Sequence, residues 1–364
     1  MNEEKQRIPI SGTFELTGRC NLACKMCLIR MDQGKNPEWK KREKTAEEWI
    51  DMARQAKDAG TLGLLLTGGE VMLRQDFCEI YEAIAQMGFL LTLYTNATMI
   101  TDEIMDVLKR YPPHQIGVTM YGASNQTYEK LCESKNGYDR FVEGMKKLSK
   151  LPSLLEMRTT IVKENRKDLS AMQDFTKEYF GENQKLQISR FVTKSIRGGA
   201  ACAEKSRLTP AENIRMVYHG LAEIHQKVQT GKLKLPEAEH MDFPSHKMQL
   251  EGQYLFQHCS AGIDQYAIAW DGNMYGCELM AEGYTEPFQM GFQEAWRTLP
   301  DQYPKSQIIR ECAQCSARDF CETCPAIRLA ETGDWFGIPD YFCKEAKYIR
   351  QMASDLGVLN KVKK

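Results

Sequence analysis

The feature that most constrains the fold is a regular alternation of strand-like and helix-like segments from residue 13 to about residue 192. Short apolar or β-branched runs alternate with amphipathic stretches that begin with capping residues and end at glycine or proline. This alternation is typical of a parallel sheet covered by helices. We predict strands at 13–17, 62–66, 89–94, 116–120, 154–162 and 186–192. We predict helices starting near residues 45, 76 and 101, and others around 138–148 and 168–179.

These six strand–helix units are too few for a closed eight-unit barrel, which needs roughly 250 residues. An α/β partial barrel or an open sheet fits better. A capping box at Thr209–Glu212 then starts a helix that we expect to run to Val228. Residues 231–258 are polar and interrupted by proline, so we interpret them as a linker. We therefore expect a domain at 1–230, the linker, and a second domain at 259–364, with a β-hairpin at 266–275 and a last helix near Cys343.

The charge balance gives no reason to expect nucleic acid or an anionic membrane as a partner. Forty-eight Lys and Arg face 49 Asp and Glu, so no net field attracts nucleic acid or an anionic membrane. The N-terminal residues are charged and lead into no apolar signal segment. No apolar run reaches the ~18 residues of a transmembrane helix. We expect a cytoplasmic protein.

Thirteen cysteines are the exceptional part of the composition. A long chain without a secretory signal is not expected to use them as a disulfide framework. Ten of them form two groups, one near each end, which scattered structural cysteines would not do. They stand at positions 20, 24, 27, 78, 132, 202, 259, 277, 312, 315, 321, 324 and 343.

The first group, Cys20, Cys24 and Cys27, follows the first predicted strand directly. Parallel α/β folds place their chemistry on such loops. Three thiolates within eight residues must bind one object, because such short loops strain internal disulfides. A zinc ion completed by a distant residue is one possibility. A four-iron cluster with one iron left open to a small molecule is the other.

This CxxxCxxC loop resembles the signature of the radical S-adenosylmethionine (SAM) enzymes, which implies a partial (β/α)6 barrel and a SAM-binding [4Fe-4S] cluster on the three cysteines. The similarity extends to Gly68, Gly69 and Glu70 after the second strand, where the family binds the SAM amino group. It implies further SAM contacts at Asn96, Thr119 and Arg158. Two positions depart from the pattern. Met26 replaces an aromatic residue near adenine, and Val71 replaces a proline.

The second cysteine group resembles the SPASM domain, a C-terminal extension of radical SAM enzymes that carries two auxiliary [4Fe-4S] clusters. The similarity covers seven cysteines and Gly272, with one residue fewer than usual before Cys324. It implies one cluster on Cys259, Cys277 and Cys324, whose fourth ligand is missing and is either an open iron, Cys202 or a carboxylate. It implies a second cluster on Cys312, Cys315, Cys321 and Cys343.

The resemblance implies reductive cleavage of SAM and hydrogen-atom abstraction from substrate, with electrons passing to the auxiliary clusters when the reaction is an oxidation. Glu278, next to Cys277, is the candidate catalytic base, although a surface glutamate is an equally good interpretation. Cys202 as a hydrogen donor would instead indicate epimerisation. We interpret Cys78 and Cys132 as packing residues in helices.

The relatives implied by this resemblance mostly oxidise, cross-link or epimerise residues of ribosomally made peptides. Few residues precede the first strand, so a separate peptide-recognition protein or recognition by the cavity alone is expected. The reductant would be a ferredoxin or flavodoxin. The alternatives are an anaerobic sulfatase-maturing (formylglycine-forming) enzyme, a small-molecule dehydrogenase, and a non-catalytic iron–sulfur or zinc scaffold.

Overall fold

The computed structural model describes residues 7–29, 42–182, 184–189, 191–194, 196–197, 203–232, 252–256 and 259–356. Within these residues the strands form one eight-stranded sheet in the order β6-β5-β4-β3-β2-β1-β7-β8. Every neighbouring pair is parallel except β7 with β8. The strands are β1 (Ser11–Thr17), β2 (Gly63–Gly68), β3 (Leu90–Thr95), β4 (Gln115–Thr119), β5 (Leu154–Thr160), β6 (Gln187–Ser189), β7 (Gln265–Ile268) and β8 (Met274–Tyr275).

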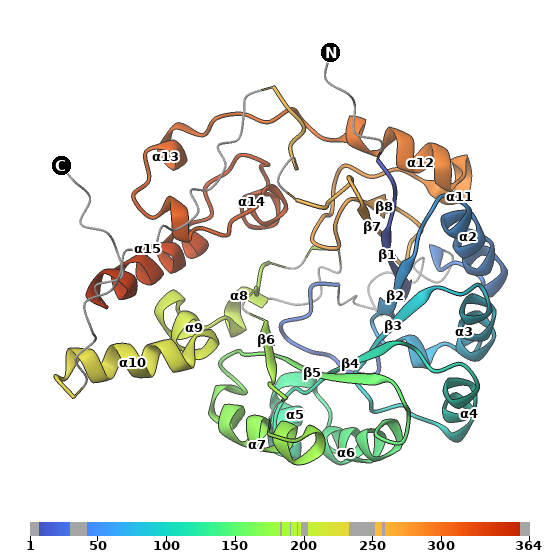
Figure 1. Ribbon diagram of the computed structural model, residues 1–364, viewed down its shortest axis with the longest axis horizontal. Helices are drawn as coiled ribbons and strands as arrows, with labels where there is room; N and C mark the ends of the chain where they lie inside the picture. Colours follow the sequence, from blue (N-terminus) through green and yellow to red (C-terminus); the bar gives the residue numbers. More distant parts are fainter. Residues whose placement is uncertain are drawn as a thin grey trace.

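Helices cover the outer side of this curved sheet, which confirms the predicted partial barrel (Figure 1). They are α2 (Ala46–Asp58), α3 (Phe77–Gln86), α4 (Asp102–Arg110), α5 (Asn125–Cys132), α6 (Gly137–Leu148) and α7 (Leu169–Phe180). The six predicted strands and the helices between them are present. The sequence analysis missed α5, and the fifth and sixth strands are shorter than predicted because β5 ends at Thr160 and β6 at Ser189.

The first strand shows why the sheet has an apolar outer face and a polar inner face. Phe14 and Leu16 are completely buried against the outer helices, and the Phe14 ring lies 5.0 Å from that of Trp49 on α2, centroid to centroid. Successive residues of a strand point to opposite faces. Glu15 therefore points to the inner face, where it pairs with Arg197. The polar residue of this strand thus lines the space inside the barrel.

The C-terminal part of the chain extends the same sheet. The predicted hairpin is present as β7 and β8, and β7 pairs in parallel with β1 from Ser11↔Gln265 to Phe14↔Ile268. This pairing was not predicted. It places the C-terminal segment beside the strand that leads into the first cysteine group. Most of the predicted linker, 231–258, lies outside the described residues.

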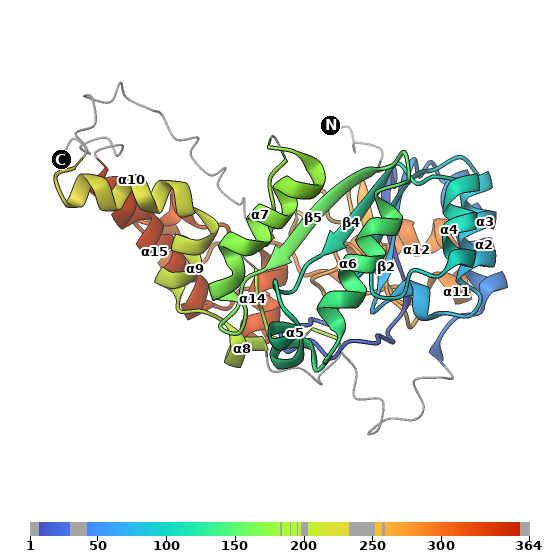
Figure 2. The same ribbon diagram turned by 90° about the horizontal axis from the view of Figure 1, so that it is seen from below.

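The remaining helices lie in two places (Figure 2): those at 210–229 and 340–355 pack together at one end of the molecule, and those at 287–298 pack beside α2. The helix predicted from Thr209 to Val228 is divided in two, because Tyr218 leaves the helical conformation at φ −105° and ψ 42°. The predicted last helix packs against both halves. None of the described helices has the length and apolar character needed to cross a bilayer. These helices are α8 (Ala203–Ser206), α9 (Pro210–Val217), α10 (His219–Gln229), α11 (Pro287–Met290), α12 (Phe292–Thr298), α13 (Arg310–Ala313), α14 (Pro325–Thr332) and α15 (Asp340–Asp355).

Two glycines at the end of β2 allow an unusually close approach to the backbone that follows β1. Gly69 N–H donates to the Thr17 carbonyl at 2.8 Å, and the next residue donates to the Arg19 carbonyl, also at 2.8 Å. A Cβ atom on Gly69 would lie 2.1 Å from the Arg19 carbonyl oxygen. Gly68 has φ +143°, and a Cβ there would lie 2.4 Å from the Thr17 oxygen. No residue with a side chain fits either position without backbone movement.

We predict that Gly69→Ala destabilises the protein by about 1–3 kcal/mol, the usual cost of overpacking, because a carbonyl group must move to admit the methyl group. Thermal unfolding measures this change. Gly63→Ala in the same strand is the control, since its Cβ would meet nothing nearer than the Ser11 hydroxyl at 3.9 Å. Equal unfolding temperatures for the two variants would contradict the close approach.

Candidate functional site

The three cysteines of the first group lie on the loop that leaves β1, at the carboxyl edge of the sheet. Cys24 is buried, and Cys20 and Cys27 are partly buried. Burial, Cys24, Glu70 and Cys27, in that order, raise the pKa of the Cys20 thiol. The three sulfurs are therefore electrostatic neighbours. They do not converge on a single ion position: among the described residues, no three His, Cys, Asp or Glu side chains do so.

Glu70 is buried beneath this loop, with 1% of its surface exposed. Its carboxylate accepts hydrogen bonds from Asn96 N at 2.8 Å, from the Thr95 hydroxyl at 2.9 Å and from Met72 N at 3.3 Å. All three hydrogen-bond donors to the Glu70 carboxylate are groups of this chain. The carboxylate thus fixes the end of β3 against the end of β2, while the backbone of Gly68 and Gly69 remains next to the cysteine loop.

Asn96 connects the end of β3 to the cysteine loop. Its amide nitrogen donates to the Asn21 side-chain oxygen at 2.9 Å and lies 3.8 Å from Cys20 Sγ. Its own oxygen accepts from Thr98 N at 2.9 Å, and the Thr98 hydroxyl accepts from Asn21 at 2.8 Å. This closed ring of hydrogen bonds orients the Asn96 amide toward the sulfur.

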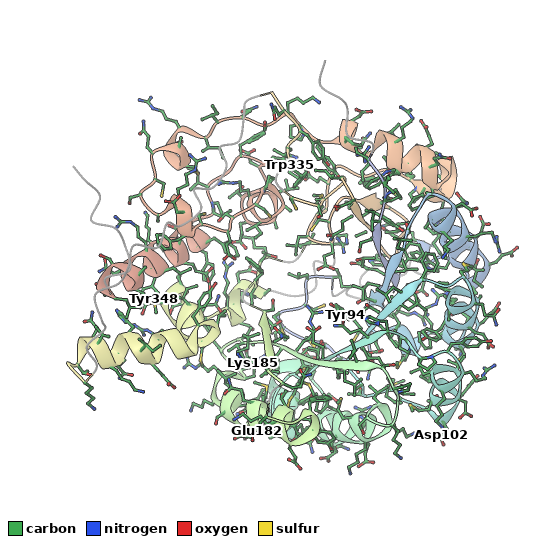
Figure 3. The ribbon with its side chains drawn as sticks, in the orientation of Figure 1. Tyr94, Asp102, Glu182, Lys185, Trp335 and Tyr348 are labelled. Carbon is green, nitrogen blue, oxygen red and sulfur yellow. The ribbon has the colours of Figure 1, made fainter. Side chains whose placement is uncertain are left out.

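The other predicted SAM contacts occupy different places around the site. Met26 is 8% exposed and packs in the apolar cluster that contains Cys24. Thr119 ends β4 and is paired in register with Arg158 of β5. The Arg158 guanidinium lies 4.2 Å from the centroid of the Tyr94 ring and 3.6 Å from the Glu156 carboxylate. Arg158 is therefore directed along the inner face of the sheet, where Figure 3 shows Tyr94.

The structure gathers the C-terminal cysteines into two sets. The pKa of Cys277 is raised to about 12 by burial and by its neighbours Glu278, Cys324 and Cys259. The pKa of Cys343 is raised by burial and by Cys321, Cys312 and Cys315. The members of each set are thus close enough to influence one another's charge. The SPASM resemblance implies the same grouping, and that each set binds a cluster stays a prediction.

Glu278 is exposed and lies in the loop after β8, directly after Cys277. Burial is the largest cause of the raised pKa of Glu15 on β1. The negative charge of Glu278 raises this pKa further, and the positive charge of Arg197 lowers it. The charge of Glu278 also contributes to the raised pKa of Tyr94 on β3, for which burial is the largest cause. The Glu278 carboxylate is therefore within electrostatic range of Glu15 on β1 and of Tyr94 on β3. Cys202, the other candidate, lies outside the described residues.

Arg197 is a residue next to the candidate site that the sequence analysis did not identify. Its guanidinium pairs with Glu15 and donates to the carbonyl oxygens of Glu278 and Met280, each at 2.7 Å. Its backbone N–H donates to the Leu28 carbonyl at 3.3 Å, directly after Cys27. Arg197 thus joins the first cysteine loop, β1 and the loop that carries Cys277. The sequence holds no local signal for this pairing, because the burial of Glu15 is known from the structure and its partner lies 182 positions away.

The first loop has the donor set of an iron–sulfur site. Thiolates are the ligands of such clusters, and a buried thiol with a raised pKa becomes a thiolate when a metal supplies positive charge. The loop offers three cysteine thiols, and burial raises the pKa of one of them, Cys20. The residues present therefore fit a cluster with three protein ligands.

The buried Glu70 predicts a pH effect on stability. Burial raises its pKa from an ordinary value of 4.5 to about 7, although three hydrogen bonds act in the opposite direction. Between these values the native state binds more protons than the unfolded state, so this group makes stability fall as pH rises. We expect a loss of up to about 3 kcal/mol across this window.

Chemical unfolding of wild type and Glu70→Gln at pH 4.5–7 measures the effect, since glutamine does not titrate. The variant should lack this part of the decline. Glu79→Gln, at an exposed position of α3, is the control and should keep the wild-type profile. Parallel profiles for wild type and Glu70→Gln would mean that Glu70 is charged throughout.

Comparison with known proteins identifies a family for residues 14–176 of the chain. Residues 14–176 match the family model of the radical SAM superfamily. The AdoMet-dependent heme synthase of Methanosarcina barkeri is 24% identical over 339 residues, which are 88% of this chain and 93% of that protein. The PqqA peptide cyclase of Rhizobium meliloti is 33% identical over 134 residues, 36% of this chain and 34% of the cyclase.

A solved structure agrees with these relatives in fold. Streptococcus suis SuiB bound to its precursor peptide SuiA superimposes with a TM-score of 0.66 at 16% identity, over 93% of this chain and 76% of SuiB. At this identity the likeness shows the fold alone. It extends through the C-terminal part that holds the two further cysteine sets. Residues 14–176 form a radical SAM domain, and the protein is an enzyme of the radical SAM superfamily.

Proposed function

We propose that this enzyme modifies a ribosomally made peptide, by oxidising, cross-linking or epimerising its residues, and that it uses two auxiliary [4Fe-4S] clusters. The observation that carries the proposal is the gathering of ten cysteines into three sets within one fold. Two observations support a peptide substrate. Part of the chain is similar in sequence to a peptide cyclase, and the fold is shared with a protein that binds a precursor peptide. The proposed domains are 1–230 and 259–364, joined by 231–258.

In this proposal Cys20, Cys24 and Cys27 hold the [4Fe-4S] cluster that binds SAM. When bound, cluster and SAM supply the oxidant that removes a hydrogen atom from the substrate. Gly68 and Gly69, which have no side chains of their own, offer their backbone to the SAM amino group. Glu70 supports this site without contacting SAM, because its carboxylate already accepts hydrogen bonds from Asn96, Thr95 and Met72.

The remaining SAM contacts follow from position. Met26 provides an apolar surface near the cluster, and Asn96 places an amide there. Thr119 and Arg158 lie together at the ends of β4 and β5, where parallel sheets bind their ligands. Arg158 carries the positive charge that a carboxylate of SAM requires. Its stacking on Tyr94 fixes the guanidinium before SAM binds.

Glu278 is the proposed base. Loss of a hydrogen atom followed by an electron to the auxiliary clusters leaves the substrate with a proton to release. The Glu278 carboxylate is an electrostatic neighbour of Tyr94 and Glu15, and Glu278 follows Cys277, a proposed auxiliary ligand. Arg197 holds the backbone carbonyl of Glu278, so the side chain is presented from a fixed loop. The proton and the electron would thus leave the substrate on the same side.

The proposed auxiliary ligands are Cys259, Cys277 and Cys324 for one cluster, and Cys312, Cys315, Cys321 and Cys343 for the other. A ferredoxin or flavodoxin is the proposed reductant, and a separate peptide-recognition protein is a proposed partner. A small-molecule substrate is the second candidate. The heme synthase favours it, because that relative aligns over 88% of this chain rather than over a part of it.

We predict that the anaerobically reconstituted protein contains about twelve irons per chain, four for each of three clusters, and converts SAM to 5′-deoxyadenosine with dithionite. Replacement of Cys20, Cys24 and Cys27 by alanine should abolish this product and leave about eight irons. Iron and sulfide analysis and chromatography of the product measure both. Zinc in place of iron, or intact clusters without SAM cleavage, would refute the proposal.

Glu278→Gln should separate hydrogen abstraction from product formation. The 5′-deoxyadenosine should still form, while oxidised substrate should fall by about 10²–10⁴-fold, the usual contribution of a general base. Glu282→Gln, an exposed position in the same loop, is the control and should behave as wild type. Candidate precursor peptides and tetrapyrroles, supplied separately, show by mass change which class is turned over. Full oxidation by Glu278→Gln would assign the proton to another acceptor.

A further inference from the structure

A fourth cysteine lies against the first cysteine loop. Cys132 is the last residue of α5 and is 1% exposed. Its sulfur lies 3.5 Å from the sulfur of Cys24, within hydrogen-bond distance for two sulfur atoms. The two residues are 108 positions apart in the chain. The sequence analysis assigned Cys132 to packing, so this contact is a feature of the structure alone.

The contact is fixed by the backbone on both sides of Cys24. Ala23 N–H donates to the Cys132 carbonyl at 2.9 Å, and Lys25 N–H donates to the Leu131 carbonyl at 3.1 Å. The last carbonyls of a helix have no partner within it. Helix α5 ends here because Glu133 adopts the left-handed conformation, with φ 57°. The loop therefore satisfies the free end of the helix, and the two sulfurs are brought together as a result.

The surroundings of the two sulfurs are apolar. They share a buried cluster of Leu22, Met26, Leu131, Val162, Val192 and Ala203, and the Tyr121 ring packs against it. Burial and then the neighbouring cysteine sulfurs raise the pKa of Tyr121, so its hydroxyl stays neutral. In an apolar environment a hydrogen bond to a charged sulfur gains strength, because water does not compete for it.

We propose that Cys132 is a positioning residue that donates an S–H···S hydrogen bond to Cys24 and raises the reduction potential of the SAM-binding cluster. The inference rests on the proposed function, in which Cys24 is a thiolate ligand. A thiolate has no proton, so the hydrogen in this contact must come from Cys132. Reduction adds negative charge to the ligand sulfurs, and a donor at one of them stabilises the reduced state.

The test compares Cys132→Ala, which removes the donor, with Cys132→Ser, which keeps one. Cys78→Ala is the matched control, because Cys78 is a half-buried cysteine on α3, away from all three sets. The first cluster is identified by the change of its electron paramagnetic resonance signal on addition of SAM. Its midpoint potential is then measured by titration, with iron content determined on the same samples.

We expect Cys132→Ala to keep its iron and to lower the midpoint potential by about 59 mV, a tenfold change for one electron. Cys132→Ser and Cys78→Ala should stay close to wild type. Equal potentials for Cys132→Ala and wild type would show that Cys132 only packs. A SAM-induced signal that appears only in Cys132→Ala would instead make Cys132 a fourth ligand. No SAM-induced signal in any of these proteins would overturn the proposed function itself.

Discussion

The site depends on one backbone contact, the approach of Gly68 and Gly69 to the segment that follows β1. Two hydrogen bonds of 2.8 Å hold the end of β2 against Thr17 and Arg19, one residue before Cys20. Glycine is required at both positions because the Cβ atom of any other residue would clash with the carbonyl oxygens of that segment. With this contact made, Glu70 is carried beneath the cysteine loop, and its carboxylate binds the end of β3. The cysteine loop is thus held in place by the ends of three neighbouring strands, β1, β2 and β3.

The strand β1 extends this arrangement to the other cysteine sets. It pairs in parallel with β2 on one side and with β7 on the other. Because β7 and β8 lead into Cys277 and Glu278, the strand that delivers the first cysteine loop also positions the loop of a proposed auxiliary ligand. Arg197 adds a second connection, from Leu28 to the carbonyl oxygens of Glu278 and Met280. The position of the first cysteine loop relative to the loop of Cys277 is therefore fixed by strand pairing and one buried guanidinium.

The sequence was sufficient to predict the features that depend on neighbouring residues or on a periodic pattern of apolar residues. The strands, the capping box at Thr45 and the hairpin follow from residue patterns, and the structure has them. The membership of the cysteine sets came from a resemblance. What the sequence could not supply was contact between distant segments. The Cys24–Cys132 contact spans 108 residues and the Glu15–Arg197 pair spans 182, and no local pattern indicates either partner.

The inner face of the sheet shows how the same strands serve binding rather than packing. The register of β3, β4 and β5 places Tyr94, Gly117 and Glu156 in one row across it. A Cβ on Gly117 would lie 2.6 Å from the Tyr94 ring and 3.3 Å from the Arg158 side chain. The glycine therefore makes room for the stacked pair. A closed barrel fills this position with branched apolar residues. Here the row holds the Tyr94 phenol and the Glu156 carboxylate, and the Arg158 guanidinium stacks on the phenol, so the inner face is polar where the outer face is apolar.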